Sequence, residues 1–248
     1  AVVAWDFTNI NSGAAAINTP YAIPHARTQH LRSDSPLRGG SYRALAANAN
    51  NFARECFMDE LGEAAGADPL AFRLAHLQDA RLRTVLETAA ERFGWANRPA
   101  GDGIGYGLAC GTEKASYVAT CAEVAVDREQ GTFRVQRLCE VFECGMVLNP
   151  DNLRSQVYGC LIMALGAVQP EEMLFEDGRI LNPRFSQYHV PRFSGVPELE
   201  VHLLNRTDID PAGGGETPMV AVAPAVANAV FDATGLRIRE LPIKLPTP

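Results

Sequence analysis

The chain has 248 residues, of which 47% are hydrophobic and 21% charged, and this composition is typical of a globular protein with a substantial core. Its net charge of −7 argues against a nucleic-acid-binding surface, which normally carries a basic excess. No apolar run reaches the roughly 18 residues that a membrane span requires, so we expect no membrane span in this chain.

The N-terminal part, residues 1–45, is expected to form irregular structure with short strands. Residues 25–31 alternate as in a strand, and Pro20, Pro24 and Pro36 prevent a helix. The first ten residues, AVVAWDFTNI, lack the basic stretch and apolar core of a signal peptide. An initiator Met is also absent, as in a chain that is processed, trimmed or excised from something longer. The sequence leaves the localisation open between bacterial cytoplasm and periplasm.

Three helices are expected next, over approximately residues 50–65, from residue 68 onward, and from residue 79 to 93. Asp68 and Asp79 suit the N-cap positions of the second and third helices, because their carboxylates can accept hydrogen bonds from the first-turn amides. Apolar residues recur along each segment at the 3.6-residue period of an amphipathic helix.

A segment rich in turn-forming residues, WANRPAGDG at 95–103, gives the best internal boundary. We therefore divide the chain into two parts. Residues 1–98 form a loop-rich N-terminal segment with a three-helix region. Residues 99–248 form an α+β part that carries the GGGE sequence discussed below.

The hydrophobic period changes after this boundary, because apolar and other residues now alternate. Strands are expected at 103–109, 117–127, 133–144, near 173–175 and at 199–204, with a strand or an extended tail at 238–243. Helices are expected at 149–166 and 223–234. Strands and helices alternate without a regular βαβ rhythm, so we predict an α+β fold with a mixed sheet and packed helices.

The thiols and imidazoles of the chain show no metal-binding spacing. The six cysteines form no CxxC pair and no ferredoxin-like cluster motif, so buried free thiols are favoured, although the sequence leaves a disulfide open. The five histidines are dispersed without an HExxH motif, and we predict no metal ligands among the side chains. No phosphate-binding P-loop and no GxSxG nucleophile motif occur.

The segment Gly213-Gly214-Gly215-Glu216-Thr217-Pro218 stands out. Three glycines suit a tight loop or a backbone that approaches a ligand closely, and they deliver one carboxylate to the edge of an apolar helix. This arrangement fits a catalytic base at Glu216. The alternative is a polar turn before a helix, and for GGGE alone that alternative is favoured.

Gln156 also lies in an apolar helical stretch, where a buried amide would need hydrogen-bond partners. The alternative is a Gln exposed on the far face of the helix, and the sequence does not decide between the two.

Four stretches, taken in order, resemble the molybdenum-binding subunit of the xanthine oxidase family, in its isoquinoline 1-oxidoreductase and aldehyde dehydrogenase branch. These stretches read SYRALAANANNFARECFMDEL, AGADPLAFRLAHLQDARLRTVLETAAERFGW, NPDNLRSQVYGCLIMALG and GGGETPMVAVAPAVANAVFDATGLRIRELP. The resemblance covers the chain from Asn18 onward and only the C-terminal portion of that subunit. It implies that the fold is the subunit's second molybdopterin-binding domain.

The resemblance implies roles for individual residues. Glu216 matches the active-site glutamate beside molybdenum, and Gly214 and Gly215 match the backbone that lies against the metal centre. Gln156 matches a glutamine that hydrogen-bonds the pterin. Arg43, with its neighbour Ala44, matches a loop that passes close to the cofactor.

The implied chemistry is hydroxylation of an aldehyde or N-heteroaromatic substrate with oxygen from water, with Glu216 as the base. The implied cofactor is molybdopterin, in its cytosine dinucleotide form, with molybdenum. The implied partners are the N-terminal portion of the large subunit, a small [2Fe-2S] subunit, and a cytochrome c or another electron acceptor.

Two rivals remain. One is a non-catalytic scaffold or interaction module of the same fold that binds no cofactor on its own. The other is a hydrolase that uses Glu216 with water, which is disfavoured because no second carboxylate or nucleophile lies at a recognisable spacing. The substrate is not determined by the sequence.

Overall fold

The computed structural model describes residues 1–34 and 40–246, and Pro36, one of the expected helix-breaking prolines, lies outside them. A search of the described helices for one long and apolar enough to cross a membrane finds none. The helices are α1 (Ala46–Ala64), α2 (Pro69–His76), α3 (Ala80–Phe93), α4 (Pro150–Val168) and α5 (Val222–Thr234). The strands are β1 (Ala4–Ile10), β2 (His25–Leu31), β3 (Ile104–Glu113), β4 (Ser116–Asp127), β5 (Thr132–Glu143), β6 (Phe175–Glu176), β7 (Arg179–Ile180) and β8 (Glu198–Leu204).

A four-stranded mixed sheet forms the centre of the structure, with the strand order β3-β4-β5-β8. β3, β4 and β5 pair antiparallel through tight connections, whereas β8 returns after α4 and pairs parallel to β5. Two smaller sheets each hold two strands, the parallel pair β1–β2 and the antiparallel pair β6–β7. The predicted α+β class with a mixed sheet and packed helices is confirmed.

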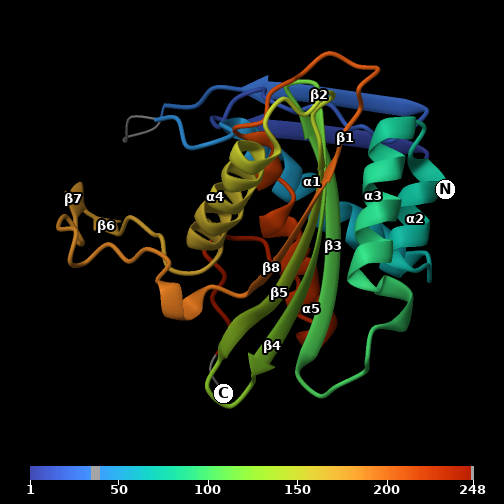
Figure 1. The fold of residues 1–248 in the computed structure, drawn as a ribbon. Coiled ribbons are helices and arrows are strands. Elements are labelled where there is room, and N and C mark those ends of the chain that lie inside the picture. The colour runs from blue at the N-terminus through green and yellow to red at the C-terminus, as the bar shows by residue number, and fades with distance from the viewer. Residues whose placement is uncertain (35–39, 247–248) are drawn as a thin grey trace.

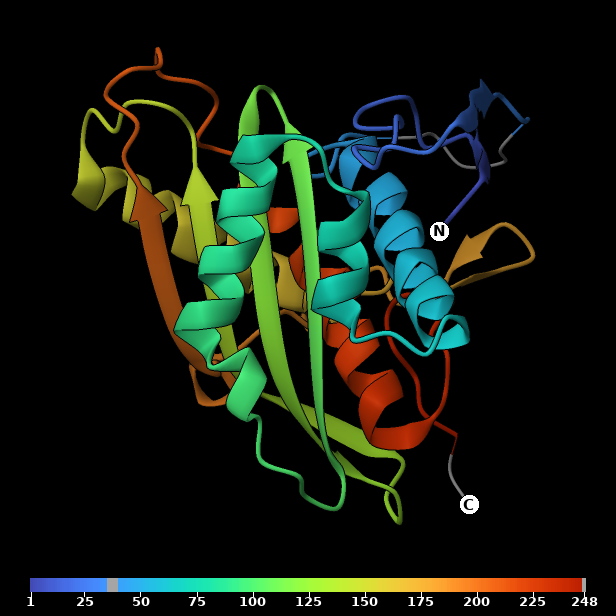
Figure 2. The same cartoon turned by 90° about the vertical axis from the view of Figure 1, so that its right-hand side faces the viewer.

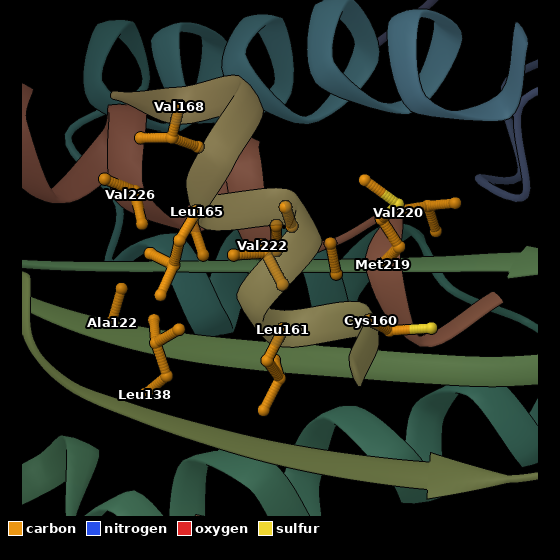
Figure 3. Close-up of a cluster of buried hydrophobic side chains, with 14 of the residues drawn as sticks. Ala122, Leu138, Cys160, Leu161, Leu165, Val168, Met219, Val220, Val222 and Val226 are labelled. Carbon is orange, nitrogen blue, oxygen red and sulfur yellow. The ribbon is translucent and has the colours of Figure 1, made fainter. Parts of the chain in front are cut away.

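Helices cover both faces of the central sheet (Figures 1 and 2). α3 packs on one face, while α4 and α5 pack on the other, and α1 lies beside α5 and the edge strand β3. Figure 3 shows the core under α4, where Leu161 and Leu165 point towards Leu138 and Ala122 of the sheet. The division of the chain at residue 98 stays a prediction, and side chains from both sides of residue 98 meet in these cores.

The predicted N-cap residues accept hydrogen bonds from the first turns of their helices. Asp68 Oδ1 accepts hydrogen bonds from two amides of the first turn of α2, and Asp79 does the same for α3. Asn149 Oδ1 accepts from the amide of Asn152 at 2.9 Å and begins α4. Gly94 ends α3 in the left-handed conformation that glycine tolerates best.

The start of α1 was predicted about four residues too late, because its first turns are polar. Asn50 and Asn51 break the apolar period, yet both are fully buried. Their amides bond backbone carbonyls of other segments, such as Ala15 O for Asn50 and Val220 O for Asn51, both at 2.8 Å. Tertiary hydrogen bonds therefore stabilise a helix start that hydrophobic periodicity does not reveal. The predicted strand at 173–175 lies slightly later, at β6, and the segment 238–243 forms no strand.

Two glycines of β3 allow α5 to approach the sheet very closely. A Cβ atom added to Gly105 would lie 2.1 Å from Ala229 O, and one added to Gly107 would lie 2.1 Å from Ala225 O. Both obstacles are backbone atoms of the helix, so no side-chain rotation could relieve the overlap. The glycine alternation at the start of β3 is therefore a packing surface for α5.

A buried carboxylate, Glu55 of α1, joins four segments of the chain. Its Oε2 accepts from Arg73 Nε of α2 at 2.9 Å and from the amide of Cys110 of β3 at 3.1 Å. Its Oε1 accepts from the hydroxyl of Tyr21 at 2.8 Å, and burial raises the pKa of Tyr21 well above its usual range. Glu55 and Arg73 have no exposed side-chain surface, so each needs the other to remain charged in the interior.

All six cysteines, which were expected to be buried free thiols, are buried and unpaired.

We expect the variant Gly107→Ala to lose about 1–3 kcal/mol of unfolding free energy or more, because α5 must move away from the sheet. Gly195→Ala is the matched control, since an added Cβ there meets no atom within 4 Å, and it should change stability by about 0.5 kcal/mol or less. Chemical denaturation of the two variants measures both effects. Equal unfolding midpoints would contradict the proposed close packing.

We also expect Arg73→Met to cost about 3–5 kcal/mol, because it leaves Glu55 charged and buried without its partner. The control is Arg27→Met, which removes an ion pair to Asp6 whose two side chains are 66% and 58% exposed. That change should leave the unfolding temperature nearly unchanged, because solvent screens an exposed ion pair. Thermal unfolding at neutral pH compares the two variants, and a similar small loss in both would show that the buried pair does not stabilise the fold.

Candidate functional site

The glycine loop at residues 213–215 is held against the tip of the β3–β4 hairpin. Ser116 Oγ donates to Gly213 O at 2.6 Å, and the amide of Gly213 donates to Lys114 O at 3.4 Å. One residue earlier, the amide of Ala212 donates to Cys144 O at the end of β5 at 2.8 Å. The loop that carries the GGGE sequence is thus fixed on both sides, although glycine itself supplies no side-chain contact.

Thr217 ties the other end of the loop to the sheet. It is fully buried, and its hydroxyl donates to Glu113 O at 2.8 Å. A 3-10 turn, Thr217–Met219, follows, and α5 begins only at Val222. The expectation that Glu216 lies at the edge of the α-helix therefore needs correction, since this turn separates the two. The turn results from the fixed φ of Pro218 at its second position, which suits a tight first turn.

Arg43 connects three of the segments that the sequence analysis singled out. Its Nε donates to Gly215 O at 2.6 Å, and its Nη2 donates to Gln156 Oε1 at 2.8 Å. The planar guanidinium can make both bonds at once because its donors form a fixed fork. One cation therefore holds the glycine loop and α4 in a fixed relation.

Gln156 is exposed on α4, as one alternative expected, but it bonds Arg43 beside the glycine loop instead of lying on the far face of the helix. Because its Oε1 faces Arg43, its two amide hydrogens remain to be donated elsewhere. No acceptor for Gln156 Nε2 is found within residues 1–34 and 40–246. A ligand above the glycine loop could take this donor.

Ala44 follows Arg43 in a conformation that is uncommon for residues other than glycine. Its φ is 67°, and that of Leu45 is 52°, so two successive non-glycine residues have positive φ. Such positions cost of order 1–3 kcal/mol each and occur often at ligand sites. Asn48 donates its side-chain amide to Arg43 O and holds this bend. The bend directs the amide of Ala44 at Glu216 Oε1, at 3.4 Å.

Glu216 lies at an open surface, with 28% of its side chain exposed, and its Oε2 forms an ion pair with Lys114 Nζ. Sequence reasoning missed Lys114. It is one of only two lysines in the chain and occupies the hairpin tip with a φ of 52°. Its position as a lone lysine in a two-residue turn between strands could have marked Lys114 as a candidate site residue. The sequence, however, does not show which loop this turn faces.

Cys160 lies under the loop, on the buried face of α4 and at one end of the core cluster that also holds Met219 and Val220 (Figure 3). Its thiol donates to Gly215 O at 3.5 Å. Burial raises the pKa of Cys160 to about 12, so the thiol stays protonated at neutral pH and keeps its donor hydrogen. Gly215 O therefore accepts hydrogen bonds from both Cys160 and Arg43.

The glycine loop leaves its own donors unused. Within the described parts of the chain, the amides of Gly214, Gly215 and Glu216 have no hydrogen-bond acceptor. A Cβ added to Gly215 would meet nothing nearer than Gln156 Oε1 at 4.0 Å, so the space above it is open. One added to Gly214 would lie 2.7 Å from Leu153 Cδ1, so the end of that side chain would have to move. Free amides beside a guanidinium can hold a group rich in oxygen acceptors and negative charge.

The six predicted site residues thus lie together. Arg43 contacts Gly215 and Gln156, and Ala44 contacts Glu216, within one surface at the end of the sheet. Their roles in binding or catalysis stay predictions.

Comparison with known proteins identifies relatives across most of the chain. The family model described as a molybdopterin cofactor-binding domain matches residues 45–197. A nicotinate dehydrogenase subunit of Pseudomonas putida is 36% identical over 241 residues, covering 90% of this chain and 20% of that protein. The beta subunit of isoquinoline 1-oxidoreductase from Brevundimonas diminuta is 32% identical, covering 90% and 29%. The aldehyde oxidoreductase molybdenum-binding subunit PaoC of Escherichia coli is 31% identical, covering 97% and 35%.

Solved structures share the fold. Quinoline 2-oxidoreductase from Pseudomonas putida superposes with a TM-score of 0.79 at 13% identity, over 91% of this chain and 54% of that chain. Aldehyde oxidoreductase from Desulfovibrio desulfuricans gives 0.79 at 15% identity, over 95% and 46%. The chain spans about a fifth to a third of the length of the three curated relatives. This chain belongs to the molybdopterin cofactor-binding domains of the molybdenum-binding subunits in the xanthine oxidase family.

Proposed function

We propose that the chain forms one side of the cofactor site in a molybdenum hydroxylase that oxidises an aldehyde or an N-heteroaromatic compound with oxygen from water. The convergence of Arg43, Gln156, Gly215 and Glu216 on one surface is the observation that carries this proposal. The names of the relatives, which refer to nicotinate, isoquinoline and aldehyde substrates, support the substrate class.

The residues present fit a molybdopterin cofactor. The Gln156 amide and the unused amides of Gly214 and Gly215 would donate to the acceptor-rich pterin and its metal-bound ligands. Arg43 and the bent Ala44 backbone would position the loop on which it rests. When bound, the cofactor supplies the oxidising centre and activates the oxygen derived from water. We propose the cytosine dinucleotide form of the cofactor.

Glu216 would act as the general base of this reaction. Its carboxylate is partly exposed beside the glycine loop, and we place the reacting group in the open space next to Gly215. The amide of Ala44 holds Oε1 and the ammonium group of Lys114 holds Oε2, so the carboxylate is oriented by two donors. A base fixed in this way accepts a proton without first having to change its rotamer.

The proposed assembly includes parts outside this chain. These are the N-terminal portion of the large subunit, which would cover the open side of the site, and a small [2Fe-2S] subunit. That small subunit would receive the electrons and pass them to a cytochrome c or another acceptor. Multi-subunit naming of the relatives supports partner subunits in general.

A second candidate function is a scaffold of the same fold that binds no cofactor by itself. The share of the relatives that this chain spans, about a fifth to a third of their length, supports this candidate for the isolated chain, because the chain supplies only one side of the proposed site.

We expect the isolated 248-residue chain to fold but to carry no molybdenum and show no oxidase activity, because it offers only one side of the site. Metal analysis of the purified chain, beside a preparation of the complete large subunit, makes the test. Full molybdenum occupancy in the isolated chain would mean that the loops at Arg43, Gln156 and Gly215 suffice.

In the complete enzyme, we expect Glu216→Gln to slow substrate-driven reduction of molybdenum by about 10²–10⁴-fold, while molybdenum content and fold stay normal. The amide keeps the size of the side chain but cannot accept the proton. Glu129→Gln, in the exposed turn between β4 and β5, is the control and should react at the wild-type rate. A rate within about threefold of wild type for Glu216→Gln, far from the loss of a general base, would remove Glu216 from this role.

A further inference from the structure

A second group of ligand-forming side chains lies on the central sheet, between β5 and the edge strand β8. Cys139 of β5 is the register partner of Glu200 of β8, and His202 follows two residues later on the same strand. Val201, between them, faces the α4 side of the sheet, so Glu200 and His202 face the α3 side together with Cys139. The three side chains therefore meet on one face at the edge of the sheet.

The donor atoms of this group are close enough to share one ion. One ligand atom from each of Cys139, Glu200 and His202 lies within 4.8 Å of the others. His202 Nε2 is 3.8 Å from Glu200 Oε2. Zinc bonds of about 2.0–2.3 Å would separate neighbouring tetrahedral donors by roughly 3.3–3.7 Å. Small rotamer changes on an edge strand can supply the remaining contraction.

One polar atom of this group lacks a hydrogen-bond partner in the described part of the chain. His202 Nε2 is buried and has no hydrogen-bond partner among the described residues. Buried polar atoms normally have a partner, so an unmet one that faces a thiol and a carboxylate indicates a missing ligand.

Arg137 fixes the carboxylate from behind. Its Nε donates to Glu200 Oε1, and its Nη1 donates to Phe93 O at the end of α3 at 3.1 Å. The guanidinium also lies over the Phe93 ring, 4.7 Å from its centre. This outer contact leaves Oε2 directed at His202, and carboxylates that bind metal ions are usually held by such a second hydrogen bond.

We propose that Cys139, Glu200 and His202 form a zinc-type site that joins β8 to β5. A thiolate and an imidazole select Zn²⁺ over Mg²⁺ or Ca²⁺, which require oxygen ligands. The thiolate and the carboxylate balance the charge of the ion. Water is the fourth ligand, since Glu200 and His202 are 28% and 32% exposed while Cys139 is buried.

The site would stabilise β8, which is an edge strand of the central sheet. Among the described strands β8 pairs with β5 alone, and it is reached through a long connection, residues 169–197, that holds the small β6–β7 pair and a 3-10 turn. An ion bound by both strands in the folded state alone would stabilise that state by mass action. The metal would be structural and lies outside the cofactor site of the proposed function.

The test uses Co²⁺ as an optical substitute for Zn²⁺ on the 248-residue chain. We expect sulfur-to-cobalt charge-transfer absorption with one Co²⁺ per chain, displaced by Zn²⁺. We also expect Zn²⁺ in excess to raise the unfolding temperature by roughly 5 °C or more. Cys139→Ala should abolish the absorption, and His202→Gln should weaken Co²⁺ binding at least tenfold.

Cys121→Ala is the matched control. Cys121 is the register partner of Cys139 on β4 and is equally buried, but it lies outside the three-residue group. This variant should keep the full absorption. Absence of the absorption in the wild-type chain, or its persistence in Cys139→Ala, would overturn the proposal. Should Cys139→Ala fail to fold, unchanged Co²⁺ affinity in His202→Gln would overturn it as well.

Discussion

The burial of one carboxylate, Glu55, constrains how α1, α2, the N-terminal loop and β3 are arranged. A charged group in the interior must be paired and hydrogen-bonded, or it would cost several kcal/mol. Glu55 meets this requirement by taking donors from Tyr21, Arg73 and the amide of Cys110. Those donors come from the N-terminal loop, α2 and β3, so α1 can occupy only one position relative to the sheet.

The same helix transmits this constraint to the functional surface. One turn before Glu55, Asn51 bonds both Cys110 O of β3 and Val220 O, directly after the 3-10 turn that follows Glu216. The loop with Arg43 leads directly into the first turn of α1. The glycine loop with Glu216 and the loop with Arg43 therefore both rest on rigid elements, as precise binding of a cofactor requires.

At the surface, cations hold the site segments together. Arg43 joins the glycine loop to α4, and Lys114 joins the β3–β4 hairpin to Glu216. The glycines supply no side chain and so leave their amides free for a ligand. The proposed zinc-type site at β8 likewise rests on a buried atom, His202 Nε2, that lacks a hydrogen-bond partner among the described residues.

Local signals in the sequence determined the helices, most strands and the α+β class, because capping carboxylates and the periods of 3.6 and two act over a few residues. Motif order revealed the family and identified Glu216, Gln156 and Arg43 as candidates. Only the tertiary structure decided that Arg43 bonds Gly215 and Gln156, and that Lys114 faces Glu216. These contacts join residues more than 100 positions apart in the sequence. Their geometry depends on where the helices lie on the sheet, and that is set by the close packing of α5 on the β3 glycines and by the buried charges of α1 and α2.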